Sequence, residues 1–160
     1  MKLIVVVLPF ILSLSAFGHG KEKHSTPEMK KEEPIAISTY EQINLQYQMK
    51  VEPIFKSKCL DCHSSQTTYP WYYQIPVVNY LINSDIKEAR SHIEMSKGFP
   101  FGSHSTPLKD LQEIEKSILS SSMPPFKYRA LHRNAALTKA ELELIISWTK
   151  SSKNLLKDLK

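Results

Sequence analysis

Glycine is scarce in this chain of 160 residues, with four in all, and alternation of β-branched with polar residues is weak. Tight turns often need glycine and half-buried strands show that alternation, so a β-sandwich or a barrel has little support. The lysines are scattered without a dense basic stripe, and the net charge is only +5, so nucleic-acid binding is not expected. No internal repeat is visible. The composition favours a small all-α domain.

Cysteine is scarcer still, and both cysteines belong to one motif. Cys59 and Cys62 are the only two in the chain, and His63 follows at once. Cys-x-x-Cys-His is the attachment signature of c-type haem, because two thiols on one helical turn can form thioethers with the two vinyl groups of one porphyrin. The adjacent imidazole can bind the iron from one side. The motif predicts one covalent haem c, with its iron, held by Cys59 and Cys62, and His63 as the proximal ligand.

Other uses of a cysteine pair fit this chain less well but stay as alternatives. A redox dithiol usually follows a strand in a βαβ unit, and no such pattern surrounds Cys59. A structural zinc site needs four ligands, and there is no second cysteine pair. A disulfide between Cys59 and Cys62 would close a strained loop, since only two residues separate them.

Residues 1–18 have the features of a secretory signal peptide. A positive start is followed by an almost wholly apolar stretch, residues 3–17, and by small residues at a cleavage site, Ala16-Phe17-Gly18. An uncleaved anchor is the alternative, but an apolar run of about 15 residues is shorter than the ~20 that span a bilayer. We therefore expect cleavage near Gly18, no stable membrane span afterwards, and a periplasmic protein, since bacteria attach c-type haem outside the cytoplasmic membrane.

The rest of the chain divides into a linker, a domain and a tail. Residues 19–38 mix lysine with glutamate around two prolines and contain few large apolar side chains, so we expect a flexible charged linker. Residues 39–152 should form a haem-binding domain, a cytochrome c-like helical fold wrapped around one covalent haem. Residues 153–160 are rich in lysine and are expected to fray.

Apolar periodicity predicts the helices of this domain. Ile43, Tyr47 and Val51 recur every four residues, and a short helix over 52–58 should lead into the motif. Proline and capping signals place the remaining helices over 76–95, over 107–119 and from Thr138 onward, where Thr138 and Glu141 form a capping box.

Aromatic residues follow the motif closely. Tyr69, Trp71, Tyr72 and Tyr73 should either form a wall of the haem site or belong to an ordinary hydrophobic core. The second ring nitrogen of His63 should donate to a backbone carbonyl, which would fix the ring orientation, and Pro70 is one possible acceptor.

The second axial ligand is predicted to be Met123. It lies in the loop Ser120–Pro125, where two prolines stiffen the backbone behind it and no helical core explains its presence. A methionine opposite histidine raises the reduction potential of a haem. His132 is the strongest rival, with His92 and His104 behind it. The other methionines are assigned to the signal (Met1), the linker (Met29), the core (Met49) and a helix end (Met95).

An ordered set of motifs resembles a known family. Val51–Phe55 before the motif is similar to the corresponding helix of class I cytochromes c. The longer pattern resembles the bacterial haem-binding domain family of exported monohaem proteins over about residues 40–150. Its elements are Cys59–His63, Tyr69–Tyr72, Pro76–Val78, Glu88–His92, Met123–Pro125, Tyr128, His132 and Leu137–Trp148. The resemblance implies haem binding and leaves the pathway open.

These observations predict a periplasmic one-electron carrier that exchanges electrons with a redox partner protein, for which a mildly basic surface favours an acidic partner. An enzyme is less favoured than an electron-transfer protein. If the sixth iron position were open, the chain could instead be a haem-based sensor of a small ligand or a peroxidase-like enzyme, with His92 or His132 as an acid–base group. A thiol–disulfide exchange protein is a third possibility and would need free thiols without haem.

Overall fold

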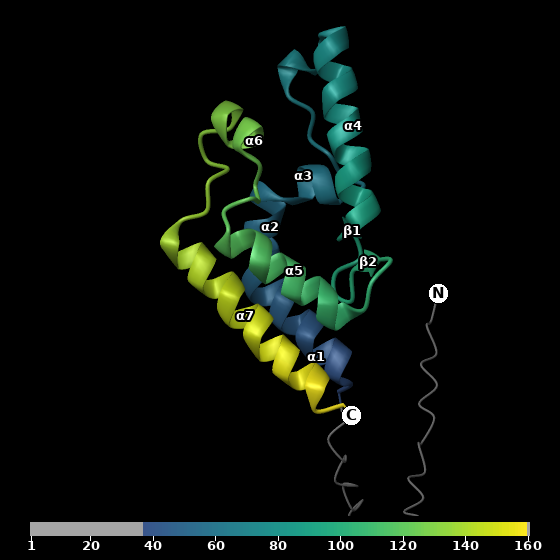
Figure 1. Ribbon diagram of the computed structural model, residues 1–160, viewed down its shortest axis with the longest axis vertical. Coiled ribbons are helices and arrows are strands. Elements are labelled where there is room, and N and C mark those ends of the chain that lie inside the picture. The colour runs from purple at the N-terminus through teal and green to yellow at the C-terminus, as the bar shows by residue number, and fades with distance from the viewer. Residues whose placement is uncertain (1–36, 160) are drawn as a thin grey trace, which may run out of the picture. The chain divides into compact units, whose positions relative to one another are not determined.

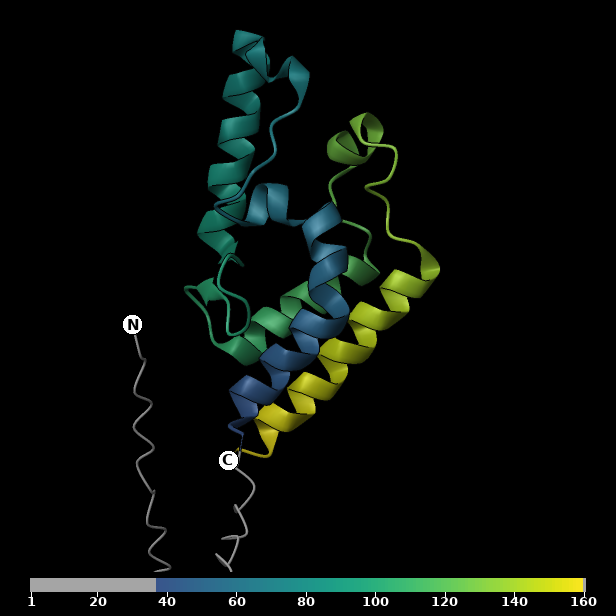
Figure 2. The same cartoon turned by 180° about the vertical axis from the view of Figure 1, so that it is seen from behind.

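The computed structural model describes residues 37–159, and this part of the chain is mostly helical (Figures 1 and 2). The predicted all-α fold class is confirmed. The predicted signal peptide and most of the predicted linker lie outside the described residues. The elements, in chain order, are α1 (Thr39–Gln46), η1 (Tyr47–Val51), α2 (Glu52–Lys58), α3 (Leu60–His63), η2 (Trp71–Gln74), α4 (Pro76–His92), β1 (Ile93–Glu94), β2 (Gly102–Ser103), α5 (Pro107–Leu119), α6 (Phe126–Leu131) and α7 (Lys139–Lys157).

The first three helices form one continuous run. Ser38 caps α1 by accepting a hydrogen bond from the Glu41 backbone at 3.2 Å. The run then passes through η1, one turn of π-helix, and into α2. Ile43, Tyr47 and Val51 are all buried, as their spacing predicts. The assignment of Met49 to the core is wrong: its side chain is 77% exposed, because it projects from the opposite side of the helix.

Aromatic rings fill the core where this run meets α5 and α7. The Tyr47 ring lies 5.8 Å from Phe55, 5.3 Å from Phe101 and 5.5 Å from Trp148, measured between ring centroids. The Trp148 indole donates to the Ile43 carbonyl at 3.4 Å. Burial of these large apolar surfaces is the main stabilising contribution in this part of the molecule.

Helix α7 extends further than the sequence indicated. The predicted capping box is present, with Thr138 and Glu141 each bonded to the other's backbone amide. The predicted frayed tail over 153–160 is wrong for residues 153–157, which continue the helix. Leu156 is buried and the Lys153 ammonium pairs with Glu115 of α5, so packing holds the last turns.

Helix α4 ends earlier than predicted, at His92 and not at Met95. Ile93 and Glu94 are extended and pair antiparallel with Gly102 and Ser103. Met95 is 5% exposed and belongs to the core cluster. The connection then turns at Gly98, where φ is +76° and a Cβ would lie 2.6 Å from the Asn44 side-chain oxygen, so glycine is required there.

Within residues 37–159, none of the helices has the length and apolar content needed to cross a membrane.

Candidate functional site

The two cysteines lie on one helical turn, which we call the attachment turn (residues 59–63). Cys59 ends α2 and donates its amide to the Phe55 carbonyl at 2.8 Å. The amides of Cys62 and His63 both donate to the Cys59 carbonyl, at 3.1 and 3.0 Å. The two sulfurs are not joined in a disulfide. The chain therefore presents two thiols and an imidazole from a single turn.

The His63 ring is oriented by the backbone at the end of α4. Its Nδ1 lies 3.1 Å from the Ile93 carbonyl oxygen. A carbonyl can only accept, so Nδ1 carries the proton and the lone pair of Nε2 is left for a ligand. The expected backbone acceptor is confirmed, but it is Ile93 and not Pro70. Pro70 lies in an extended segment, whereas the break between α4 and β1 leaves the Ile93 carbonyl outside the helix.

Burial keeps all three groups of the attachment turn neutral. It raises the pKa of the Cys59 thiol to about 12, and it also raises the pKa of Cys62, to which the Asp61 carboxylate adds. Burial lowers the pKa of His63, against smaller opposing contributions from hydrogen bonds to the Ile93 and Ala89 backbone. Thiol–disulfide exchange uses cysteines of lowered pKa. Neutral imidazole, in contrast, is the form that binds a metal.

Helix α6 is bonded to the attachment turn. The Tyr128 hydroxyl donates to the Asp61 carboxylate at 2.9 Å, and the same carboxylate accepts from the Thr68 amide at 3.0 Å. Asp61 is one of the two variable positions of the motif. Its side chain therefore joins the attachment turn both to α6 and to the segment before η2.

Both ring nitrogens of His132 are occupied by hydrogen bonds. Nδ1 lies 3.0 Å from the Tyr128 carbonyl oxygen, and Nε2 lies 3.3 Å from the Tyr72 hydroxyl. The ring also stacks on Tyr128, at 4.1 Å between centroids and 24° between planes. His92 and His104 are exposed. Met123 is 38% exposed, between the end of α5 and the start of α6.

Lys58, directly before Cys59, has a buried side chain with three partners. Its ammonium donates to the carbonyls of Asn134 and Ala136, at 2.8 and 2.7 Å, and lies 3.1 Å from the Glu141 carboxylate. This one residue joins the attachment turn to the loop after α6 and to the first turn of α7. Sequence reasoning missed Lys58, Asp61 and Ile93, because no periodicity or spacing relates residues 30 to 83 positions apart.

Large apolar side chains are exposed on the elements around the attachment turn. They lie on and beside η2 and α4, at the end of α5, and on or before α6: Tyr69, Trp71, Ile75, Val77, Tyr80, Leu81, Leu119, Met123, Phe126 and Leu131. Soluble proteins seldom expose so much apolar surface without a ligand or partner to cover it. These side chains, the two thiols and the oriented imidazole fit a large flat apolar group such as a porphyrin.

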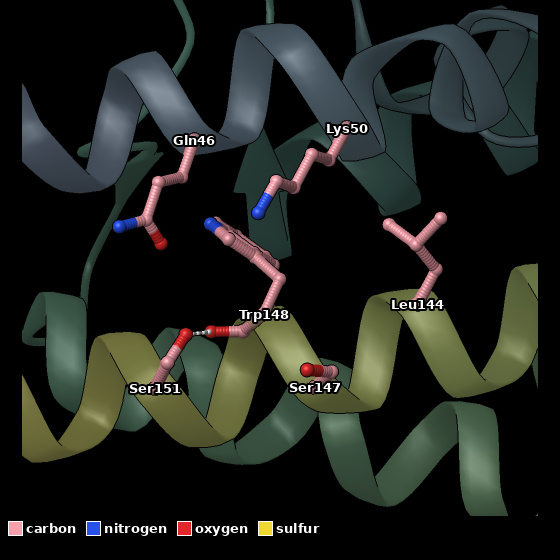
Figure 3. Close-up of a pocket in the computed structure, with 6 residues that line it drawn as sticks. All are labelled: Gln46, Lys50, Leu144, Ser147, Trp148 and Ser151. Carbon is pink, nitrogen blue, oxygen red and sulfur yellow. Dashed lines mark hydrogen bonds between the residues drawn. The ribbon is translucent and has the colours of Figure 1, made fainter.

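Two hollows lie among the described residues, and residues 59–63 line neither of them. One, of about 370 Å³, lies between the first helical run and α7 and is lined by Gln46, Lys50, Leu144, Ser147, Trp148 and Ser151 (Figure 3). The other, of about 480 Å³, lies along α4 and is lined by Tyr69, Asn83, Ile86, Lys87, Arg90 and Ser91. Neither has a cysteine, histidine or methionine in its lining.

Comparison with known proteins identifies the family. The model of the haem-binding domain family matches residues 22–151. The chain belongs to this family. The prediction of haem binding, and with it of iron, is thereby confirmed for this haem-binding domain. Cytochrome c peroxidase Ccp of Escherichia coli (strain K12) is 29% identical over 92 residues, which cover 56% of this chain and 20% of that protein. The haem-binding domain thus spans about a fifth of that relative. No solved structure matches.

Proposed function

We propose that this haem-binding domain carries one covalently attached haem c and acts as a one-electron carrier in the periplasm. Cys59 and Cys62 would form the two thioethers, and His63 would bind the iron through Nε2. The observation that carries the proposal is the attachment turn, which combines two free thiols with an imidazole whose other nitrogen is bonded to Ile93. When bound, haem supplies a reversible one-electron change between ferric and ferrous iron.

The chain's own contribution is to hold and tune the ligand. The hydrogen bond from Nδ1 to the Ile93 carbonyl fixes the plane of the His63 ring and increases the basicity of Nε2. Burial disfavours the imidazolium, so the ring is available to iron in its neutral form. A second backbone bond, from the Met95 amide to the His63 carbonyl at 2.7 Å, ties the same residue to the core. Together these contacts support His63 as the proximal ligand.

We propose Met123 as the distal ligand. Met123 lies in a loop and is partly exposed, whereas both ring nitrogens of His132 have partners, the Tyr128 carbonyl at Nδ1 and, more weakly, the Tyr72 hydroxyl at Nε2. That contrast supports the thioether over the imidazole. A thioether favours ferrous iron, so the site would have a higher potential than a bis-histidine site. The apolar side chains around the attachment turn would cover the ring faces, and the exposed remainder would meet a redox partner protein.

A second candidate function is a peroxidase-like enzyme or a sensor of a small ligand. The observation that favours it is the similarity to the E. coli cytochrome c peroxidase over 92 residues. In that case the sixth iron position would be open, and His132, held by Tyr72, would serve as an acid–base group.

Mass and ligand binding distinguish these functions. The protein is produced in a host that matures c-type haem, and its intact mass is measured under denaturing conditions. A mass equal to the polypeptide alone would contradict covalent attachment.

Carbon monoxide is then titrated against the ferrous protein. For an electron carrier, we expect carbon monoxide to bind the wild type slowly or not at all and to bind Met123→Ala rapidly. Rapid binding to the wild type would instead indicate an open sixth position. Loss of the low-spin spectrum in His132→Ala but not in Met123→Ala would make His132 the ligand.

A further inference from the structure

The loop that carries Met123 is held at both of its ends. At the first end, the amides of Ser122 and Met123 donate to the Ser117 carbonyl of α5, at 3.0 and 3.4 Å. Beyond Met123, two prolines of fixed φ lead directly into α6. A displacement of α6 would therefore be transmitted to Met123, because little flexible backbone separates the two.

Helix α6 is in turn fastened mainly through Tyr128. Its hydroxyl donates to Asp61 at 2.9 Å, which lies within the attachment turn itself. Asp61 is a fixed point, since its carboxylate also accepts from the Thr68 amide and its carbonyl accepts from the Thr67 hydroxyl, at 3.0 and 2.8 Å. None of the residues of α6 is buried, so apolar packing does little to hold the helix in place.

Two weaker connections support the same helix from α4 and η2. The Lys127 ammonium pairs with Asp85 of α4 at 2.6 Å, but the two side chains are 67% and 38% exposed, and ion pairs in contact with solvent contribute little. The Tyr72 hydroxyl reaches His132 at 3.3 Å, longer than an ordinary O–H···N bond. The Tyr128–Asp61 bond is shorter, partly buried and made to a charged acceptor, so it is the strongest of the three.

We propose that Asp61 and Tyr128 are positioning residues that hold the Met123 loop against the attachment turn and so set how firmly the sixth iron position is closed. This inference rests on the proposed function, because it takes Met123 as the distal ligand. The views in Figures 1 and 2 agree with it, since in both the segment between α5 and α6 rises beside the end of α2 that leads into the attachment turn.

Tyr128→Phe tests the inference in the haem-loaded protein. The variant loses one hydrogen bond and keeps the ring that stacks on His132. Carbon monoxide should bind the ferrous variant about tenfold faster than the wild type, the factor expected from loss of a hydrogen bond to a charged group. The reduction potential should fall as the thioether dissociates more readily. Tyr40→Phe is the matched control, since Tyr40 lies on α1, outside the site, with a 42% exposed side chain, and it should leave both quantities unchanged.

Asp61 provides a second, independent route to the same contact. Asp61→Ala removes the acceptor of both the Tyr128 hydroxyl and the Thr68 amide, so it should bind carbon monoxide at least as fast as Tyr128→Phe. Asp61→Asn keeps one oxygen for one of these two donors and should lie between Asp61→Ala and the wild type. This pair serves if Tyr128→Phe fails to fold. The double variant Asp61→Ala with Tyr128→Phe should bind carbon monoxide no faster than Asp61→Ala alone, because the contact between the two residues is already lost in that variant.

The outcomes separate this inference from the function it rests on. If Met123→Ala opens the sixth position but Tyr128→Phe and Asp61→Ala bind carbon monoxide at the wild-type rate, the positioning role is wrong and the distal ligand stands. If Met123→Ala itself binds carbon monoxide at the wild-type rate, Met123 is not the distal ligand, and the positioning role of Asp61 and Tyr128 is wrong as well.

Discussion

The domain has two halves that are stabilised in different ways. The bundle half (α1, η1, α2, α5 and α7) buries its large side chains against one another, with Ile43, Leu111 and Ile145 fully covered. The site half (α3, η2, α4 and α6) has one buried residue in its helices, Ile86. In Figure 1 the bundle half occupies the lower part of the domain, with α4 and α6 extending upward from it.

Polar contacts stabilise the site half, as apolar packing stabilises the bundle half. Tyr128 with Asp61, Lys58 with the loop after α6, and His63 with Ile93 each join segments far apart in sequence. The bundle half thus covers its central apolar side chains from within, whereas the site half leaves most of its apolar surface for another molecule to cover. Since the chain belongs to the haem-binding domain family, we expect that molecule to be the haem. The following predictions test this division, beginning with the largest effect.

His63→Ala should abolish low-spin haem altogether, because the attachment turn offers no other metal ligand on the same side. The absorption spectrum of the ferric and ferrous variant, read against His104→Ala as a control at an exposed histidine, measures this. The bundle half should stay folded, so far-ultraviolet circular dichroism should change little. A low-spin spectrum retained in His63→Ala would contradict the proximal assignment.

Leucine truncations should separate the halves by stability. Leu111→Ala, at a fully buried position of α5, should cost about 2–5 kcal/mol in free energy of unfolding. Leu81→Ala, at a position of α4 that is 54% exposed, should cost less than about 0.5 kcal/mol in protein without haem. Urea denaturation of both variants measures the difference. Equal losses would show that the halves do not differ in this way. With haem bound, the cost of Leu81→Ala should rise.

Lys58→Met should weaken the connection between the halves. The variant keeps an apolar stem but leaves the Asn134 and Ala136 carbonyls without their donor, at a cost of roughly 1–3 kcal/mol. Lys56→Met, at an exposed i,i+4 ion pair with Glu52, is the control and should stay within about 0.5 kcal/mol of the wild type. Thermal unfolding monitored by circular dichroism compares the two. A harmless Lys58→Met would mean that these bonds merely replace bonds to water.

Asp110 provides a small effect inside the bundle half. Burial raises the pKa of its carboxyl, and the hydrogen bond from Ser103 lowers it by less. A raised folded-state pKa means that stability is lost as pH rises from the ordinary carboxyl range through the folded pKa. The free energy of unfolding of Asp110→Asn, measured relative to that of the wild type, should therefore be higher at pH 7 than at pH 4. Urea denaturation at both values checks it, and a difference of opposite sign would contradict the assignment.

Local signals in the sequence predicted local structure well. The four-residue spacing of Ile43, Tyr47 and Val51 and the capping box at Thr138 and Glu141 describe contacts within one helix, and both are present. The Cys-x-x-Cys-His motif likewise specifies a single turn. Met49 was misplaced because an apolar residue on a helix does not by itself reveal which side is covered.

Long-range contacts could not be read in the same way. The partner of His63 is a carbonyl 30 residues away, and that of Asp61 is a hydroxyl 67 residues away. Neither contact produces a periodic pattern or a bias in composition, since each forms only when α4 or α6 packs beside the attachment turn. The extension of α7 was missed because lysines near a chain end resemble a solvated tail, while Leu156 and the Lys153–Glu115 pair show their effect only after α5 is in place.

The hydrogen bond from His63 to Ile93 has a consequence for how this domain can vary. The acceptor belongs to the main chain, so no exchange of the side chain at position 93 removes it. What matters is that α4 stops at His92, which leaves the next carbonyl pointing out of the helix. Insertions or deletions that shift this stop should rotate the imidazole, while exchange of the side chain at position 93 leaves the acceptor in place. The orientation of the His63 imidazole thus depends on where a helix ends and not on which side chain follows it.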